Sequence, residues 1–469
     1  MLRWHRLQLA LVLGIFLAFA RSKADLFVPA DYSSIQAAIN AASPGDTIHL
    51  AAGRYSETLT INKNLTLAGS GTNNCVLYCQ TNIPLITITG PAAVTLSDFE
   101  LNGGNYVSGF YNGASPLGIT ATNTSLVMNR MIMNQFYNFF VTDRDGSIAA
   151  TNVFLWTRDI FVQCDVGFQL DGCTGTVSRL VHDGKRIDHT ININGLTSHH
   201  SDINVEDSTI RTSGGSYGNC IRTYVNSRVR IANCYLYRGP GDAVPSAPAF
   251  NHSGISVNGY SNLVTIAGNT ISNVPWAMYF YGSPGLGGNQ LMVESNTFLN
   301  SPIGGVVWDG MTYKGVDLGG GALGSRGGNS FSETPSAPAT FIVDVLFTNS
   351  SGFSSANIFA LHNTWSNPTN KEAVIYDKLD NPNDGRLISD DLLAKAAGLD
   401  ASRRPMISWN ERGAGEKYTV EIRPDVLNGA WSNAPGSWPI TNSGLNAMTW
   451  TNPATVTSNL FFRVRSLVP

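Results

Sequence analysis

The chain has 469 residues, of which only 13% are charged, while Gly supplies 47 positions. Few charges, many glycines and almost no helical periodicity point to an all-β chain with many tight turns. The formal net charge of −3 argues against nucleic acid as the main partner, because phosphate binding needs a basic surface.

Residues 1–24 have the pattern of a secretory signal peptide. A basic start with Arg3 and Arg6 precedes an apolar run over residues 7–20, and Ser22 and Ala24 place small residues before the expected cut. The run is too short for a comfortable membrane span, and no later segment is both long enough and apolar enough to cross a membrane. We therefore expect a secreted protein, extracellular or periplasmic and not membrane-spanning, that starts near Asp25 with a charge of about −7.

The first element expected in the mature chain is a short amphipathic helix over residues 33–42. Ser33 and Gln36 have the spacing of a capping box, and Pro44 with Gly45 provides a stop signal. Such a helix would cover the first coil of a solenoid, whose open end needs a cap.

A short phrase then recurs at intervals of 23 to 36 residues: Asn or Asp, a small or variable residue, and an apolar residue. Units of this kind cannot bury an apolar face alone, but stacked units share a continuous core. Asn suits a corner because it tolerates a left-handed backbone and its amide can bond the coils above and below. We predict a right-handed parallel β-helix over residues 25–388 with a corner ladder that contains Asp98, Asn129, Asn152, Asp207, Asn233, Asn269, Asn296, Asn329 and Asn363, and in which Ser178 fills the gap after Asn152.

A second phrase in each coil reads apolar, variable, apolar, polar, and is often followed by Gly. Period-two alternation places its apolar residues inside the coil and the others outside. The outward set comprises Gln169, Asp171, Asn192, Asn194, Arg222, Tyr224, Asn258, Tyr281 and Asp309. An alternative interpretation is that Asp or Asn before Gly, as at Asp171, Asn194 and Asn258, marks an ordinary turn.

The pattern changes after residue 388. Residues 389–404 are predicted to form a helical linker with a short helix over 389–398, and residues 405–469 a C-terminal β-sandwich module. The tryptophans of this module, Trp409, Trp431, Trp438 and Trp450, are expected in its core, with a sugar-binding stripe as the alternative. The six cysteines leave disulfides and buried thiols equally open.

Four segments near the start resemble the opening of many pectin-lyase-like β-helix proteins, and pectin methylesterases start similarly. They are Ser34-Ile-Gln-Ala-Ala-Ile, Pro44-Gly-Asp-Thr-Ile, Gly53-Arg-Tyr-Ser-Glu and Leu65-Thr-Leu-Ala-Gly. Three later segments resemble an uncharacterised family of secreted bacterial β-helix repeat proteins, namely Val316-Asp-Leu-Gly-Gly-Gly, Gly324-Ser-Arg-Gly-Gly-Asn and Ala360-Leu-His-Asn-Thr-Trp. The resemblance implies the fold for residues 27–388 and does not carry over the active-site segments of pectin methylesterases or polygalacturonases.

The C-terminal module resembles β-modules on secreted proteins of planctomycete-like and verrucomicrobium-like bacteria. The match lies in Tyr418-Thr-Val-Glu and Phe461-Phe-Arg-Val-Arg. We expect this module to contact either the cell envelope or a glycan.

A second outward set follows the corner ladder. Counting four residues on from Asn152, Ser178, Asp207 and Asn233 gives Trp156, His182, Arg211 and Tyr237. Charged residues surround these positions: Arg158, Asp159, Asp183, Lys185, Arg186, Asp188, Arg238 and Asp242. We expect both outward sets to border one groove over about four coils. The alternative is that residues 182–189 form only a solvated loop.

The chemistry of this groove fits an acidic polysaccharide, because Arg binds carboxylates bidentately and aromatic faces stack on sugars. We predict a substrate-binding set of Trp156, Arg158, His182, Asn194, Arg211, Tyr224, Tyr237, Arg238, Asn258 and Tyr281.

A uronate lyase is favoured over a glycoside hydrolase. Calcium on Asp171, Asp183 and Asp188 would neutralise the uronate carboxylate, and Lys185, Arg186 or Arg222 would act as the base. Asp183 is also a catalytic candidate, because a hydrolase would pair Asp171 with Asp183. No nucleotide or organic cofactor is expected. The alternative functions are a non-catalytic carbohydrate-binding protein and a cell-surface or adhesin-like β-helix, because the fold alone does not define the activity.

Overall fold

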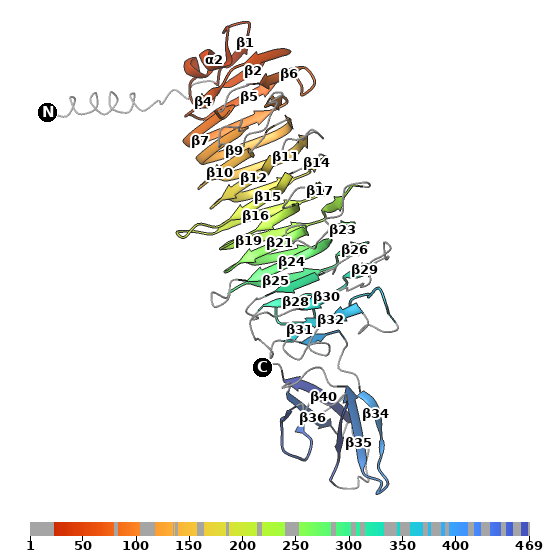
Figure 1. Ribbon diagram of the computed structural model, residues 1–469. Coiled ribbons are helices and arrows are strands. Elements are labelled where there is room, and N and C mark those ends of the chain that lie inside the picture. The colour runs from red at the N-terminus through yellow and green to blue at the C-terminus, as the bar shows by residue number, and fades with distance from the viewer. Residues whose placement is uncertain are drawn as a thin grey trace, which may run out of the picture.

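The computed structural model describes residues 23–78, 83–103, 118–134, 136, 139–156, 164–183, 187–212, 218–239, 253–282, 288–301, 306–309, 315–332, 345–347, 357–368, 374–376, 386–389, 394–410, 417–423, 432–441, 447–453 and 461–467. Within these ranges a long stack of parallel strands is followed by two small antiparallel sheets (Figure 1).

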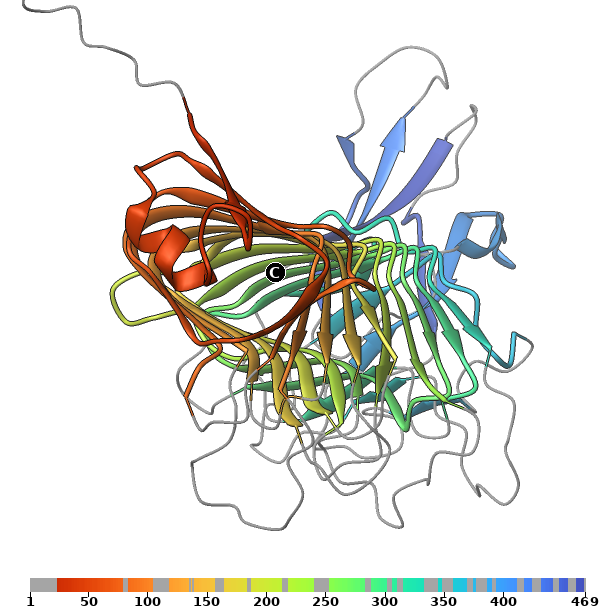
Figure 2. The same ribbon diagram turned by 90° about the horizontal axis from the view of Figure 1, so that it is seen from above.

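Each coil of the stack passes through three strand positions, which we call sheets 1, 2 and 3. One coil, for example, contains β12 (Cys164–Asp171) in sheet 1, β13 (Thr174–Ser178) in sheet 2 and β14 (Val181–His182) in sheet 3. Every strand pairs in parallel with the strand one coil away, as in the register Leu170↔Ile193. Seen along the stack, the strands of successive coils overlie one another (Figure 2).

Sheet 1 is the sheet that carries the second sequence phrase. Its strands are β4 (Leu59–Ile61), the first parts of β7 (Ile86–Ser97) and β9 (Ile119–Asn134), β10 (Phe139–Arg144), β12, β15 (Ile187–Asn194), β18 (Asn219–Thr223), β21 (Ser253–Gly259), β24 (Trp276–Gly282), β27 (Val306–Asp309), β30 (Val345–Phe347) and β32 (Ile375–Tyr376).

Sheet 2 follows sheet 1 in each coil. Its strands are β1 (Asp25–Val28), β2 (Thr47–Leu50), β5 (Leu65–Gly69), the later part of β7, the middle of β9, the first part of β11 (Ser147–Trp156), β13, β16 (Ser201–Glu206), β19 (Ser227–Ala232), β22 (Leu263–Ala267), β25 (Gln290–Glu294), β28 (Val316–Gly319), β31 (Asn357–Ala360) and β33 (Arg386–Ile388).

Sheet 3 completes the coil. Its strands are β3 (Gly53–Ser56), β6 (Cys75–Tyr78), β8 (Glu100–Asn102), the ends of β9 and β11, β14, β17 (Thr209–Thr212), β20 (Tyr235–Arg238), β23 (Thr270–Ser272), β26 (Thr297–Leu299) and β29 (Ser330–Ser332).

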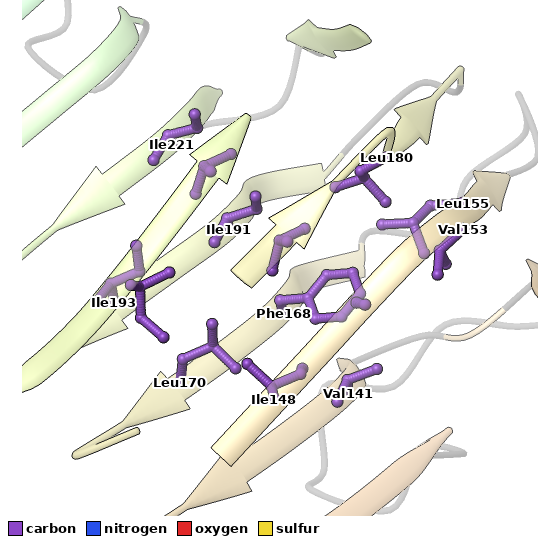
Figure 3. Packing of buried hydrophobic residues seen from close by; sticks show 14 of the residues in the cluster. Val141, Ile148, Val153, Leu155, Phe168, Leu170, Leu180, Ile191, Ile193 and Ile221 are labelled. Carbon is purple, nitrogen blue, oxygen red and sulfur yellow. The ribbon is translucent and has the colours of Figure 1, made fainter. Parts of the chain in front are cut away.

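The three sheets enclose one continuous apolar core. Alternating residues of each strand point inward, so that Phe168, Leu170 and Ile191 meet Ile148 and Leu180 from the other sheets (Figure 3). All five side chains are buried. The core therefore follows from the period-two pattern of the sequence, repeated at one strand spacing per coil.

The turn between sheets 2 and 3 contains the predicted Asn ladder, but only in its C-terminal part. Four amides stack there, Asn269, Asn296, Asn329 and Asn363, of which the first three are buried. The side-chain oxygens of Asn296, Asn329 and Asn363 each accept from the backbone N–H and the side-chain amide of the Asn one coil earlier, at 2.9 and 3.0 Å for Asn296, while that of Asn269 accepts from the backbone N–H of Cys234. The ladder predicted from these four residues is confirmed.

In the N-terminal coils the polar corner residues lie one position earlier in the turn than the ladder residues do, at the position that Gly268 occupies before Asn269. They have a left-handed backbone with φ between 49° and 64°, and they are Asp98, Arg130, Asn152, Arg179, Asp207 and Asn233. The position after each holds the inward residue, for example Phe99 or Leu180, which is fully buried. Two predicted members are therefore wrong: Asn129 and Ser178 precede the left-handed residues Arg130 and Arg179, because charged residues occupy the corner in those coils.

The first coil is closed by α2 (Ile35–Ala41), which buries Ile35 and Ile39. Its N-cap is Ser34, whose hydroxyl accepts from the N–H of Ala37 at 3.1 Å, so the predicted capping box starting at Ser33 is off by one residue. The carboxylate of Glu57 accepts from the N–H groups of Ile35 and Gln36 at 2.9 and 3.0 Å. The cap thus comes partly from the next coil, which ties the helix to the stack.

The C-terminal region forms two antiparallel sheets around a separate core. One sheet contains β34 (Ala394–Leu399), β35 (Pro405–Asn410) and β39 (Ala447–Thr451), and the other β36 (Lys417–Arg423), β37 (Ser432–Asn433), β38 (Ile440–Thr441) and β40 (Phe461–Leu467). Trp409 and Trp450 are buried in this core and Trp438 packs against it, which confirms core packing for these three, while Trp431 lies outside the described residues.

The helix predicted over residues 389–398 is wrong where it overlaps β34. Ala394 to Leu399 pair antiparallel with β35 instead. The alanines give this segment a high helix propensity, but propensity is a weak preference that pairing in a sheet overrides.

Four cysteines, Cys75, Cys173, Cys220 and Cys234, are buried free thiols. Within the described ranges, no helix is long and apolar enough to cross a membrane. The predicted signal peptide over residues 1–24 lies almost wholly outside these ranges.

Candidate functional site

The outer face of sheet 1 carries two parallel files of polar side chains. In one file Gln169, Asn192 and Arg222 are in register on successive coils. In the other file Asp171 is in register with Asn194, and Tyr224 follows one coil later, directly after Thr223. The register thus confirms that the outward residues of the second phrase stack along the helix.

Hydrogen bonds join the two files into one network, which we call the sheet 1 network. The amide of Asn192 donates to the side-chain oxygen of Gln169 at 2.8 Å, and Gln169 in turn donates to the carboxylate of Asp171. The amide of Asn194 donates to the same carboxylate oxygen at 2.9 Å. Asp171 is therefore an acceptor held by two amides and not an isolated turn residue.

Several polar atoms of the network remain without a partner in the described part of the chain. They are the side-chain oxygens of Asn192 and Asn194 and the Nε of Arg222. Asn192 is only 7% exposed. Buried polar atoms are normally paired, so these three atoms are exceptions in this network.

Arg222 lies at the centre of this face. Its guanidinium stacks over the ring of Tyr224 at 4.9 Å from the centroid, and its Nη1 donates to Nε2 of His189 at 3.1 Å. Burial lowers the pKa of Arg222. A guanidinium fixed on two sides and partly desolvated is a strong partner for an anionic group.

A third file of polar residues lies near the beginning of the sheet 1 strands and comprises His189, Asn219 and Ser253. It is connected to Arg222 through His189. The amide nitrogen of Asn219 lies 3.2 Å from Nδ1 of His189, and the Asn219 oxygen accepts from the backbone N–H and the hydroxyl of Ser253 at 3.0 and 2.6 Å. All three side chains are buried. His189 is therefore a buried residue that orients the exposed-side Arg222 through a hydrogen bond to its guanidinium.

The second predicted set lies on the outer face of sheet 3. Arg211 and Tyr237 are in register there. His182 pairs with Ile210, so Asp183, the residue after His182, aligns with Arg211 one coil earlier in the same file. Nη1 of Arg211 lies 3.2 Å from a carboxylate oxygen of Asp183. Arg238, half-buried at the end of β20, donates from Nε to the backbone oxygen of Asn273 at 2.8 Å.

The prediction of His182 as a substrate-binding residue is wrong. Its side chain is fully buried in the core, where Nδ1 lies 2.9 Å from the hydroxyl of Thr190. Burial lowers the pKa of His182 to about 4, so the imidazole is neutral. The error has one cause: Ser178 was taken as the corner residue, whereas Arg179 is, which moves the outward position from His182 to Asp183.

Asp143 is a second buried titratable group of these coils, and the sequence analysis did not single it out. It pairs in register with Leu170, so its carboxylate points into the core. It is 1% exposed, and neither oxygen has a hydrogen-bond partner in the described residues. Burial raises the pKa of Asp143 to about 7.

Several predicted site residues fall where the structure gives no side-chain description. Arg158, Asp159, Lys185, Arg186 and Asp242 lie outside the described residues. The backbones of Trp156, Asp188, Tyr281 and Asp309 are placed in strands, but their side chains are not described. Tyr281 is in register with Asn258 on sheet 1, where Asn258 is half-buried and accepts from Ser256 at 3.0 Å.

The predicted calcium ligands are only partly described. Asp171 belongs to the sheet 1 network, whereas Asp183 follows β14 in sheet 3 and pairs with Arg211. Among the residues with described side chains, no group of three or more His, Cys, Asp or Glu is arranged to hold a metal ion. Because the side chain of Asp188 is not described, the calcium site stays a prediction.

The two outward sets therefore occupy two different sheets. The connections between sheets 3 and 1 that would border a common groove include residues 157–163, 184–186, 213–217 and 240–252, outside the described ranges. His189, Asn219 and Ser253 form a connected file that was not predicted from the sequence. Their spacing matches the coil length, and this was the one signal available.

No protein-family model and no curated protein sequence matches the chain. Among solved structures, it is similar to a pectin methylesterase in complex with a hexasaccharide, with 12% identity, a TM-score of 0.33 and coverage of 60% of this chain and 90% of that one. A PL6 family alginate lyase has 13% identity and a TM-score of 0.37, covering 79% of this chain and 54% of that one. The mannuronan C-5 epimerase AlgE6 A-module of Azotobacter vinelandii has 16% identity and a TM-score of 0.32, covering 70% and 90%.

The strand register, the order of the three sheets and the Asn ladder define this chain as a right-handed parallel β-helix protein.

Proposed function

We propose that the outer face of sheet 1 binds an extended acidic polysaccharide. The observation that carries the proposal is the sheet 1 network, in which Asn192, Gln169, Asp171 and Asn194 form one hydrogen-bonded row beside the Arg222–Tyr224 pair. Successive coils repeat at the strand spacing of about 4.8 Å, so the face offers a regular series of donors and acceptors to a polymer.

The charge of the ligand is argued from Arg222. Its guanidinium lies between His189 and Tyr224 and gives this face a positively charged group, which would attract a carboxylate or sulfate.

Binding of an acidic polymer and β-elimination of it need different groups on the protein. A lyase needs a base for the C5 proton, and Arg222 is poorly suited because a guanidinium stays protonated in proteins even when burial lowers its pKa. The remaining candidate bases, Lys185 and Arg186, lie outside the described residues. Lyase activity is therefore a finer proposal that needs its own test, with Lys185 as base.

The binding proposal is tested by affinity electrophoresis of the mature protein in gels containing polygalacturonate, alginate or a neutral glucan. Arg222→Gln should weaken binding to the acidic polymer by about tenfold or more, because a charge-assisted hydrogen bond contributes about 1.5–3 kcal/mol. The matched control is Arg228→Gln, which changes an exposed Arg on sheet 2 and should leave binding unchanged. Equal retardation of the wild type in all gels, or an equal loss in both variants, contradicts the proposal.

The lyase proposal is tested on the same polymers by ultraviolet absorbance of the unsaturated product. We expect Lys185→Ala to abolish product formation, and chelation to abolish it if calcium holds the carboxylate. Binding of acidic polymer with no product from any of them refutes the lyase and leaves a non-catalytic binding protein.

A further inference from the structure

Two tyrosines form an exposed aromatic pair on sheet 3, away from the sheet 1 network. Tyr235 and Tyr237 lie two residues apart on β20, so both point to the outer face. Their rings stack with centroids 4.9 Å apart and an interplanar angle of 10°. Tyr235 is 42% exposed, while Leu236 between them is buried in the core.

A charged pair borders this aromatic surface. Nη1 of Arg211 lies 3.2 Å from Oδ1 of Asp183, and the two side chains are 17% and 59% exposed. Arg211 is in register with Tyr237 on the neighbouring coil. Burial raises the pKa of Tyr237, and the nearby Asp183 carboxylate raises it further, which is consistent with this placement.

The backbone makes room for the guanidinium of Arg211. A Cβ at Gly239 would lie 2.3 Å from Nη2 and 2.5 Å from Cζ of Arg211, so no larger residue fits there without moving it. The guanidinium therefore lies against the backbone of Gly239 and within 3.2 Å of Asp183. A donor group beside an exposed ring is an arrangement that the core does not require.

The position of the tyrosines also argues against a purely structural role. Tyr235 is in register with Thr209 and Thr270 on the two neighbouring coils, and Tyr237 is in register with Arg211 and Ser272. Thr and Ser at three of these four positions show that the strand does not need a large aromatic residue there. Both rings instead remain on the outer face of the sheet, where they contribute nothing to the apolar core.

We propose that Tyr235, Tyr237, Arg211 and Asp183 form a second carbohydrate site, specific for neutral pyranose units. A sugar ring would stack on the exposed face of Tyr235, with hydroxyl groups accepting from Arg211 and donating to Asp183. The charged pair is neutral overall and offers both donors and acceptors, which suits the hydroxyl groups of a neutral sugar. This site differs from the sheet 1 face in both position and ligand class.

The test uses the intact mature protein and gels containing barley β-glucan, xylan, galactan or galactomannan. We expect retardation by at least one of these neutral polymers and about a tenfold loss of that affinity in Tyr235→Ala, since tenfold corresponds to about 1.4 kcal/mol. Tyr235→Phe should keep most of it, because the stacking face remains. Tyr260→Ala is the matched control, since Tyr260 is 36% exposed but lies on another turn.

The two sites are separated by crossing the variants. Tyr235→Ala should leave binding to acidic polymer unchanged, and Arg222→Gln should leave binding to neutral polymer unchanged. An unchanged urea midpoint in Tyr235→Ala shows that the variant is folded. The inference is overturned when the wild type binds none of the neutral polymers, or when Tyr235→Ala binds them as well as the wild type does.

Discussion

The coils of the amide ladder and the coils beneath the sheet 1 network handle buried polar groups in opposite ways. In the ladder, the side chain of Asn296 is fully buried and its amide donates three hydrogen bonds, to Ile266, Glu294 and Asn329. In the middle coils, the carboxylate of Asp143, Nε2 of His182 and Oγ1 of Thr223 are buried without a hydrogen-bond partner in the described residues.

The difference teaches where stability and function reside along one repeat. A buried amide that stacks on its own kind satisfies its hydrogen bonds at every coil, so it stabilises the fold. A buried polar group without a partner costs free energy, and natural proteins keep such groups mainly at functional sites. Asp143, His182 and Thr223 lie in or next to the coils that carry Asp171 and Arg222, while Ser301 Oγ and Trp365 Nε1 are unpartnered among the described residues of the ladder coils.

The largest expected effect comes from breaking the ladder at its centre. Asn296→Ala leaves the backbone N–H of Asn269 and the backbone oxygen of Ile266 without the partners they have in the wild type. We expect a loss on the order of 4 kcal/mol in the free energy of unfolding, measured as a lower urea midpoint by circular dichroism.

Asn233→Gly is the matched control in the same turn. Asn233 is an exposed corner residue with φ 55°, and its amide reaches Asp207 only at 3.4 Å. Gly adopts this conformation readily and occupies the corner at Gly268, so the change should be less than about 0.5 kcal/mol. Equal losses in both variants would contradict the distinction between ladder and corner.

The next effect is a gain in stability from the middle coils. Asp143→Leu replaces a buried carboxylate by the residue that its register partner Leu170 already provides. The folded chain holds the Asp143 proton up to a pKa of about 7, whereas an unfolded carboxyl releases it near 3.8. Asp143 therefore destabilises the fold progressively as pH rises from about 4 to 7, by roughly 4 kcal/mol at most.

The measurement is a series of urea midpoints between pH 4 and 8. The Asp143→Leu variant should lack this decline and exceed the wild type in stability at pH 8. A variant that is equally stable or less stable at pH 8 would show that the carboxylate is not buried without partners.

The smallest of these effects has the opposite pH dependence. The imidazole of His182 has a pKa of about 4 when folded and 6.5 when unfolded. Unfolding therefore takes up a proton, and stability is lost as pH falls from about 6.5 to 4, by roughly 3 kcal/mol at most. His182→Leu should remove this acid sensitivity, because its file neighbours Leu155 and Ile210 are apolar.

The exposed His200 provides the control, since His200→Leu should leave the urea midpoints unchanged at every pH. Acid sensitivity that persists in His182→Leu would have to come from other groups and would contradict the neutral, buried imidazole.

The sequence was sufficient to predict the fold because the coil repeats its own pattern. The apolar alternation defined the inner face, and the four C-terminal Asn residues defined a corner whose amides stack. It was insufficient for the boundaries set by tertiary contacts. The alanine-rich residues 394–399 form a strand because β35 is available for pairing, and Ser34 rather than Ser33 caps α2.

The candidate site was predictable only as far as the register was. The outward residues of sheet 1 keep a constant phase, so Gln169, Asn192 and Arg222 were correctly grouped. The second set depended on a corner residue in every coil, and a charged corner at Arg179 shifted one member into the core. Whether two faces of a solenoid meet depends on connecting loops, which carry no such periodic signal.

The stacking of whole coils also fixes how this molecule can change in length. Asn269 and Asn296 occupy the same place on consecutive turns, 27 residues apart, so residues 270–296 correspond to one full turn. Excising or duplicating such a unit shortens or lengthens the molecule by a single strand spacing of about 4.8 Å and leaves every remaining file aligned. The length of the outer face therefore changes only in whole coils, and a polymer bound along it would meet equivalent positions at the same spacing of about 4.8 Å.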